Sequence, residues 1–417
     1  MADACDPVAA RSLCAPFASA WQHQFSIGQG LDDAMATNGI SPAVVCFPFV
    51  GDTLGGSSIS ALNLIRHLDR DRYEPLILMH QVDGAAAKLF TDEEVAFEAA
   101  PLDGVASGTR RGDDLRYMLA KSGSLARFLR ERRVSIVHTN DGRMHATWGV
   151  PARLAGARLL WHHRADPRAA GLRFLAPWIA DRVVSVSKFS SPQPGLISAA
   201  RKCDVIHSPF DTDSEPPERA PGRQAILEEF GCRPDAHVVG FVGNMITRKR
   251  PLMFVEAIGR MLARDPGLHI AAPMFGEERE ETEQVLDAIE RHGLGAHVRL
   301  MGFRYPPETW IAGLDVLLVP AVKEPFGRSL IEAMLLRTPL IAADSGGNPE
   351  IIRHGETGYL VPPDDPDAMA ERTLAFLGDD PARRSIAAAA RDDALARFGM
   401  QRHAQSIMQI YDDLLTH

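Results

Sequence analysis

The chain has 417 residues, a length typical of two or three domains. Its composition, with 45% hydrophobic and 24% charged residues, is that of an ordinary globular protein and excludes wholesale disorder. The formal net charge of -9 gives no electrostatic reason to expect a nucleic acid as a partner.

The cysteines and the apolar runs indicate the cellular compartment in which the protein works. The five cysteines are scattered, odd in number and free of any Cys-x-x-Cys pair, which is typical of a reducing cytosol and argues against disulfides and thiolate metal sites. They are Cys5, Cys14, Cys46, Cys203 and Cys232. No apolar stretch approaches a signal peptide or the roughly 18 residues of a membrane span. We therefore expect a cytoplasmic protein, and its oligomeric state is not predicted.

The first half of the chain alternates apolar runs with helical segments. Residues 1–40 form an N-terminal extension of unknown role, and an N-terminal domain is expected over 41–212. Continuous apolar strands between helices predict a parallel sheet covered on both faces. The predicted strands are 43–50, 74–79, 134–138, 157–162, 182–187 and 203–207.

A proline-rich and charged stretch, 210–223, predicts a linker, after which the alternation restarts. Strands are predicted at 237–244, 268–275, 297–303, 314–320 and 338–343. A second domain is expected over 213–398, and a helix over 399–417 is expected to return to the N-terminal domain. The fold class is thus α/β, with two Rossmann-like doubly wound domains facing across a cleft. Ligands of such sheets bind beyond the carboxyl ends of the strands.

The stretch 319–352 carries the most chemical information. A strand ends near Pro320, a loop carries Glu324, and a helix runs through Glu332. Residues 327–330 fall in the first helical turn, whose free N–H groups suit a phosphate. The two carboxylates are at most about 12 Å apart along a helix, and each can accept hydrogen bonds from vicinal sugar hydroxyls.

These residues resemble a known family. EPFGRSLIEAM (324–334) resembles the Glu-x7-Glu signature of the family 4 retaining glycosyltransferases, which have the two-domain GT-B fold. FVGNMITRKRPLMFVEAI (241–258) resembles the strand, basic loop and helix that open the family's second domain. SGGNPEII (345–352) and HGETGYLVPPDD (354–365) follow in the family's order. The resemblance covers about residues 42–417 and is most specific in the second domain.

The resemblance implies roles for the second-domain residues. Glu324 contacts the donor sugar, Glu332 binds the ribose, and Lys249 stabilises the departing diphosphate, with Arg248 and Arg250 beside it. Further donor contacts are expected along the loop and helix start, at Phe326, Gly327, Arg328, Ser329 and Leu330.

In the first domain the resemblance places a phosphate-contacting turn at Gly55 and Gly56. It places a sugar-site histidine at His163, with His162 as a rival for that position. One departure concerns the second domain, where Asn244 stands in the place of the family's usual arginine. One cationic phosphate contact is therefore missing or is supplied by a neighbouring arginine.

The resemblance implies transfer of a sugar from a nucleotide-diphosphate sugar to an acceptor hydroxyl in glycan, polysaccharide or glycolipid biosynthesis. Front-face attack with retention is expected, and the alternative is double displacement through a carboxylate such as Asp141 or Glu324. The sequence is interpreted as lacking an aspartate-rich metal motif of the Asp-x-Asp kind, so neither a metal nor a cofactor is expected. The alternatives are a sugar-nucleotide epimerase of the same fold and a non-catalytic sugar-nucleotide-binding protein. The sugar, the base and the acceptor, whether glycan, lipid-linked or a small molecule, are not predicted.

Two features of the first domain have more than one interpretation. Its arginines bind an anionic acceptor or form a solvated face; they are Arg143, Arg164, Arg168 and Arg173. The basic amphipathic helix predicted over 113–133 contacts the inner membrane face peripherally or is an ordinary surface helix. His138 and His145 are interpreted as structural.

Overall fold

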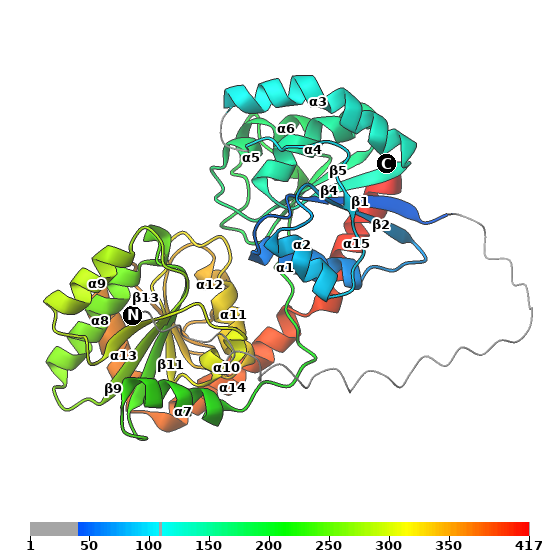
Figure 1. Ribbon diagram of the computed structural model, residues 1–417. Helices are drawn as coiled ribbons and strands as arrows, with labels where there is room; N and C mark the ends of the chain where they lie inside the picture. Colours follow the sequence, from blue (N-terminus) through cyan, green and yellow to red (C-terminus); the bar gives the residue numbers. More distant parts are fainter. Residues whose placement is uncertain (1–40, 108–110, 417) are drawn as a thin grey trace, which may run out of the picture. The chain divides into compact units, whose positions relative to one another are not determined.

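The computed structural model describes residues 41–107 and 111–416, and two parallel sheets organise them (Figure 1). By their contacts, residues 42–417 group into one compact unit that holds both sheets. The predicted extension 1–40, with Cys5 and Cys14, lies outside the described residues. Cys46, Cys203 and Cys232 are free thiols.

The first sheet has seven parallel strands in the order β3-β2-β1-β4-β5-β6-β7. Its strands alternate with helices along the chain, as continuous apolar strands require. The elements are β1 (Ala43–Phe49), α1 (Gly56–Arg66), β2 (Tyr73–Met79), α2 (Ala85–Asp92), β3 (Glu98–Ala99), α3 (Arg111–Glu131), β4 (Val134–Thr139), α4 (Gly142–Ala155), β5 (Arg158–His163), α5 (Ala170–Phe174), α6 (Ala176–Ile179), β6 (Arg182–Ser185), η1 (Ala200–Lys202) and β7 (Cys203–Val205).

The second sheet has six parallel strands in the order β10-β9-β8-β11-β12-β13. Its elements are α7 (Arg219–Phe230), β8 (His237–Val242), η2 (Thr247–Lys249), α8 (Pro251–Arg264), β9 (Ile270–Phe275), α9 (Thr282–Arg291), β10 (Val298–Gly302), α10 (Pro307–Ala312), β11 (Val316–Val319), α11 (Arg328–Leu335), β12 (Leu340–Ala343), α12 (Asn348–Ile351), β13 (Tyr359–Val361), α13 (Pro366–Leu377), α14 (Asp380–Arg397) and α15 (Met400–Thr416).

Both sheets reverse their strand order once. In the first sheet the chain moves outward from β1 to β3 and then returns to place β4 on the other side of β1. In the second sheet β8 and β11 have the same relation. Helices diverge to opposite faces at such a switch point and leave a crevice at the carboxyl ends of the strands, where ligands of these folds bind. The loops after β1, β4, β8 and β11 are therefore where this fold presents a ligand site.

Helices cover both faces of each sheet (Figure 1). In the first sheet, α1, α2 and α15 bury residues such as Leu64, Phe90 and Ile407 on one face. On the opposite face, α3 and α4 bury Leu129 and Trp148. The apolar side of α3 is thus packed against the sheet's own helices, and the membrane contact proposed for it stays a prediction. Across residues 41–107 and 111–416 we find no helix long and apolar enough to cross a membrane.

The last helix, α15, packs against α1 and β4. Its fully buried Tyr411 places its hydroxyl 2.5 Å from His138 Nδ1 on β4. The chain entering the linker pairs beside the start of this helix, because Phe210 forms a parallel bridge with Gly399, the residue before α15. The end of the chain is therefore part of the core beneath the first sheet.

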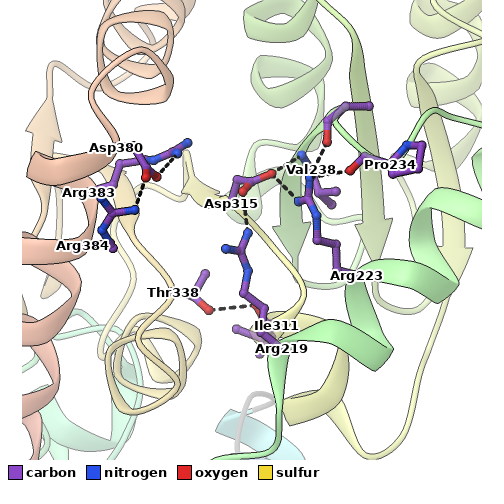
Figure 2. A network of polar contacts seen from close by, with 11 residues as sticks. Arg219, Arg223, Pro234, Val238, Ile311, Asp315, Thr338, Asp380, Arg383 and Arg384 are labelled. Carbon is purple, nitrogen blue, oxygen red and sulfur yellow. Dashed lines mark hydrogen bonds and ion pairs between the residues drawn. The ribbon is translucent and has the colours of Figure 1, made fainter.

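A buried carboxylate ties the amino-terminal edge of the second sheet (Figure 2). Asp315, directly before β11, accepts a 2.7 Å hydrogen bond from the Val238 amide of β8 and lies 2.6 Å from Arg223 Nη1. Arg219 forms a second ion pair with it. Burial alone would raise the pKa of Asp315, but the two arginines and the amide hold it below its usual range. This end of the sheet is stabilised by charge, while the opposite end faces the crevice.

Three elements differ from the sequence-based expectation. The predicted linker 210–223 is too long, because α7 begins at Arg219. The short strands β3 and β13 were not predicted, because β3 has no continuous apolar run and that of β13 is only three residues long. Both residues of β3 are exposed, and two of the three residues of β13 are partly exposed. They are the edge or near-edge additions that a buried-strand pattern does not detect.

Candidate active site

A cavity of about 850 Å³ is lined by loops that follow the carboxyl ends of strands in both sheets. Its wall includes residues from the loops after β4 and β5 of the first sheet and from the loops after β8 and β11 of the second sheet. The cavity therefore lies at the points where both sheets reverse their strand order. Nine of the predicted site residues line it: Gly56, His163, Arg248, Lys249, Glu324, Phe326, Arg328, Ser329 and Glu332.

Other predicted residues are not among the described residues on this wall. Arg250 turns to Asp364, with Nε 2.9 Å from Oδ1, and Leu330 is fully buried in the core. Gly327 is the residue before α11, and Gly55 lines a smaller cavity of about 320 Å³. The rival histidine, His162, points to His138 at 3.1 Å, so His163 is the member of that pair on the wall.

The centre of the site is a carboxylate between two cations. Glu324 is 7% exposed, and its Oε2 lies 3.0 Å from Lys249 Nζ and forms an ion pair with Arg248. Burial would raise the pKa of Glu324, but the charges of Lys249 and Arg248 hold it below its usual range. One negative charge thus faces two positive charges across the switch point between β8 and β11.

Glycines fix the position of Glu324. The Glu324 carbonyl accepts a 2.8 Å hydrogen bond from the Gly347 amide. Gly346 has φ +63°, and a Cβ there would come within 2.6 Å of the backbone nitrogen and oxygen of Glu324. The sequence resemblance included this Gly-Gly pair but assigned it no role. Its role is to let two loops pack backbone to backbone.

The loop after β8 is also closely packed. A Cβ at Gly243 would lie 3.2 Å from Lys249 Cδ, so the glycine makes room for the lysine stem. Asn244, at the position of the expected arginine, exchanges 3.2 Å hydrogen bonds with Glu277. Its amide therefore braces the loop. With Arg250 directed to Asp364, Lys249 and Arg248 are the cations of this loop on the cavity wall.

The start of α11 presents donors to the cavity. The Ser329 hydroxyl is buried on the wall and has no hydrogen-bond partner among the described residues. Arg328 Nη2 lies 3.6 Å from Glu332 Oε1, one turn further along the helix. Burial, and to a lesser extent Glu308, raises the pKa of Glu332, while Arg328 opposes that rise. A helix start of this kind suits an anion, and a half-buried carboxylate suits hydroxyl donors.

On the first-sheet side, His163 Nε2 lies 3.0 Å from the Asp166 carbonyl. A carbonyl only accepts, so Nε2 carries the proton, and burial lowers the pKa of this neutral ring. Asp141 caps α4 by accepting from the amides of Arg143 and Met144 at 2.9 and 3.0 Å. His145, interpreted as structural, stacks on Trp161 at 3.9 Å and also lines the wall.

The described part of the chain holds no cluster of three or more histidine, cysteine or acidic side chains suited to a metal ion. The sequence does contain an Asp-Thr-Asp triplet at 211–213. Asp211 there accepts from the Asp213 amide at 3.0 Å and from Ser214, which makes it a local turn. Neither aspartate is among the described residues of the cavity wall.

Two family models match the chain, one over each of the two sheets. A model described as "Glycosyltransferase Family 4" matches residues 54–214, and one described as "Glycosyl transferases group 1" matches residues 236–379. The HepE protein of Anabaena, solved in complex with UDP and glucose, superposes with a TM-score of 0.73 at 20% identity, over 88% of this chain and 99% of that one. Sucrose-phosphate synthase of Thermosynechococcus elongatus superposes with a TM-score of 0.67 at 18% identity, over 90% and 99%.

The fold is therefore the two-domain GT-B fold, and the predicted fold class is confirmed. The chain belongs to the family 4 glycosyltransferases. A D-inositol 3-phosphate glycosyltransferase of Corynebacterium diphtheriae is 32% identical over 203 residues, which is 46% of this chain and 47% of that protein. The chain spans about half the length of the curated relatives it matches.

Proposed function

We propose that the chain transfers a sugar from a nucleotide-diphosphate sugar to an acceptor hydroxyl, with retention of configuration and without a divalent metal. The observation that carries the proposal is Glu324 held 3.0 Å from Lys249 at the switch point of the second sheet. HepE, a structural neighbour, is solved with UDP-glucose, which supports a nucleotide-sugar donor. The acceptor is a glycan, a lipid-linked molecule or a small molecule.

The reaction breaks the bond between the sugar's anomeric carbon and a diphosphate oxygen, and it forms a bond from that carbon to the acceptor oxygen. Negative charge grows on the diphosphate as it leaves. Lys249, Arg248 and the start of α11 lie on one wall and can stabilise that charge. The acceptor proton passes to the departing phosphate oxygen. Glu324 orders both cations and can accept a hydroxyl of the donor sugar.

Two contacts favour front-face attack over a covalent intermediate. Asp141 commits one carboxylate oxygen to capping α4, where it accepts hydrogen bonds from two backbone amides. Glu324 is paired with two cations, which lowers its nucleophilicity. A glycosyl adduct trapped on either carboxylate would contradict this route.

The proposal is tested by thermal shift with UDP-, GDP- and ADP-sugars in the presence of EDTA. A ligand that binds the folded state at 100 times its Kd adds about 2.7 kcal/mol of stability. We expect a clear rise in Tm with at least one nucleotide sugar. No rise with any of them, or a rise only after a divalent metal is added, contradicts the proposal. Conversion of the donor to an isomeric nucleotide sugar without acceptor would indicate an epimerase instead.

Replacing Glu332 by alanine is expected to weaken donor binding by about 10- to 100-fold, since a hydrogen bond to a charged group contributes about 1.5–3 kcal/mol. Titration calorimetry with the nucleotide sugar identified above measures the change. Glu371→Ala, on the exposed side of α13, is the control and should bind as the unaltered protein does. Equal donor affinities in the two variants would show that Glu332 does not bind the donor.

Gly346→Ala is expected to lower turnover by about tenfold or more, because its methyl group pushes on the Glu324 backbone. The control is Gly355→Ala, which also has positive φ, +80°, but has nothing within 4 Å of the added carbon. Both variants carry about 1–2 kcal/mol of left-handed backbone strain. A Tm measurement reports the backbone strain that both variants share, and a steady-state assay reports the displacement of Glu324. Equal turnover in the two variants would contradict the role assigned to Gly346.

A further inference from the structure

Arg164, directly after His163, is a cavity-wall cation that has no carboxylate partner in the described part of the chain. Among the described residues, no acidic oxygen lies within 4.0 Å of its guanidinium nitrogens. Three other wall cations have such a partner: Lys249 and Arg248 pair with Glu324, and Arg328 pairs with Glu332.

The hydrogen-bond partners of Arg164 are neutral and loosely placed. Nη1 lies 3.1 Å from Ser208 Oγ, and Nη2 lies 3.4 Å from Asn140 Oδ1 and 3.3 Å from His162 Nδ1. Nε is buried and has no partner among the described residues. These contacts hold the side chain in place, but they supply no negative charge.

The histidines around these partners supply no negative charge either. Burial, with the charge of Arg164 as a further cause, lowers the pKa of four neighbouring histidines, so their rings are neutral. They are His138, His145, His162 and His403. Burial and the nearby Arg328 also lower the pKa of Arg164 itself, to about 9. The guanidinium is therefore a positive charge in a site that disfavours one.

A buried charge without a partner costs free energy, and a planar guanidinium binds carboxylate or phosphate through two parallel N–H bonds. Arg164 and its fixed neighbours all belong to the first sheet, after β4, β5 and β7. The cations assigned to the donor diphosphate belong to the second sheet. We infer that Arg164 binds an oxyanion, a phosphate or a carboxylate, carried by the acceptor, an inference that rests on the proposed function.

The test follows binding of inorganic phosphate, and separately of acetate, to the protein saturated with UDP. UDP occupies the donor site, so added anions report on a second one. Phosphorus NMR line widths follow phosphate, and proton saturation transfer follows acetate. The variants are Arg164→Gln, which removes the charge, and Arg164→Lys, which keeps the charge but cannot form two parallel N–H bonds to one anion. Arg201→Gln, an exposed arginine of η1 that is not among the described residues of the cavity wall, is the control.

We expect saturable binding of at least one anion, weakened about tenfold or more in Arg164→Gln, less in Arg164→Lys, and unchanged in the control. UDP affinity should change less than about twofold in the Arg164 variants. The anion that binds with the higher affinity, phosphate or acetate, indicates whether the acceptor carries a phosphate or a carboxylate. An anion that binds equally well to Arg164→Gln, or no saturable binding to the unaltered protein, would overturn the inference. A tenfold loss of UDP affinity would assign Arg164 to the donor diphosphate and overturn it too. If UDP does not bind the unaltered protein, the nucleoside diphosphate identified by the thermal shift takes its place. Failure of UDP, GDP and ADP alike to bind would instead contradict the proposed function, and the same anion titrations without nucleotide still test Arg164.

Discussion

Lys249→Ala is expected to lower kcat by about 10²–10³, with a smaller change in the KM for the donor. The ammonium group lies on the cavity wall beside Glu324, where the proposed reaction develops charge on the departing diphosphate. Its effect is larger on the transition state than on the bound donor, because the leaving group gains negative charge as the bond breaks. Steady-state kinetics with saturating acceptor measures the change.

Arg250→Ala is the matched control for this prediction. Arg250 is the next residue, with the same sign of charge, but it pairs with Asp364 at 2.9 Å and is not among the described residues of the wall. It should keep a rate within about threefold of the unaltered enzyme. A Lys249→Ala rate within that same range, or an equal loss in Arg250→Ala, would show that the charge of Lys249 does not act on the leaving group.

The strands at the centre of each sheet could be predicted because they are buried on both faces and therefore read as continuous apolar runs. β8 and β11 are examples: all four residues of β11 are buried, as are the four central residues of β8. β3 and β13 could not be predicted in this way, since edge strands need no such run. The start of α7 inside the predicted linker was missed because its first turn carries proline, glycine and arginine, which also favour loops.

The site could be predicted only in part, for a physical reason. Lys249 and Glu324 are far apart in sequence, and only the strand order brings them to one switch point. Nothing local separates Arg248 from Arg250; the difference arises from φ +55° at Arg250 and from Asp364 on a distant loop. The isolation of Arg164 likewise depends on where the carboxylates of the neighbouring loops point: Asp141, for example, caps α4, and a motif does not encode this.

Asp315→Ala is expected to lower the free energy of unfolding by about 3–5 kcal/mol, the cost of removing one partner from a buried ion-pair network. The substitution leaves the Val238 amide without its acceptor and Arg223 without its charge partner (Figure 2). Chemical denaturation measures the loss. Because Asp315 lies at the sheet end away from the cavity, the folded variant should keep the donor affinity of the unaltered protein.

The loss should depend on pH in a direction that follows from the lowered pKa of Asp315. A carboxyl whose folded pKa lies below its unfolded value, about 3.9, stabilises the fold fully above that value and loses this contribution as the pH falls through the folded pKa. The difference between the variant and the unaltered protein should therefore be constant from about pH 5 to 8 and shrink below about pH 4. Asp380→Ala is the control, because Asp380 pairs with Arg383 and Arg384 on the exposed surface of α14 and should barely change stability (Figure 2). An Asp315→Ala variant as stable as Asp380→Ala would show that packing, and not this carboxylate, holds β8 and β11 together at that edge.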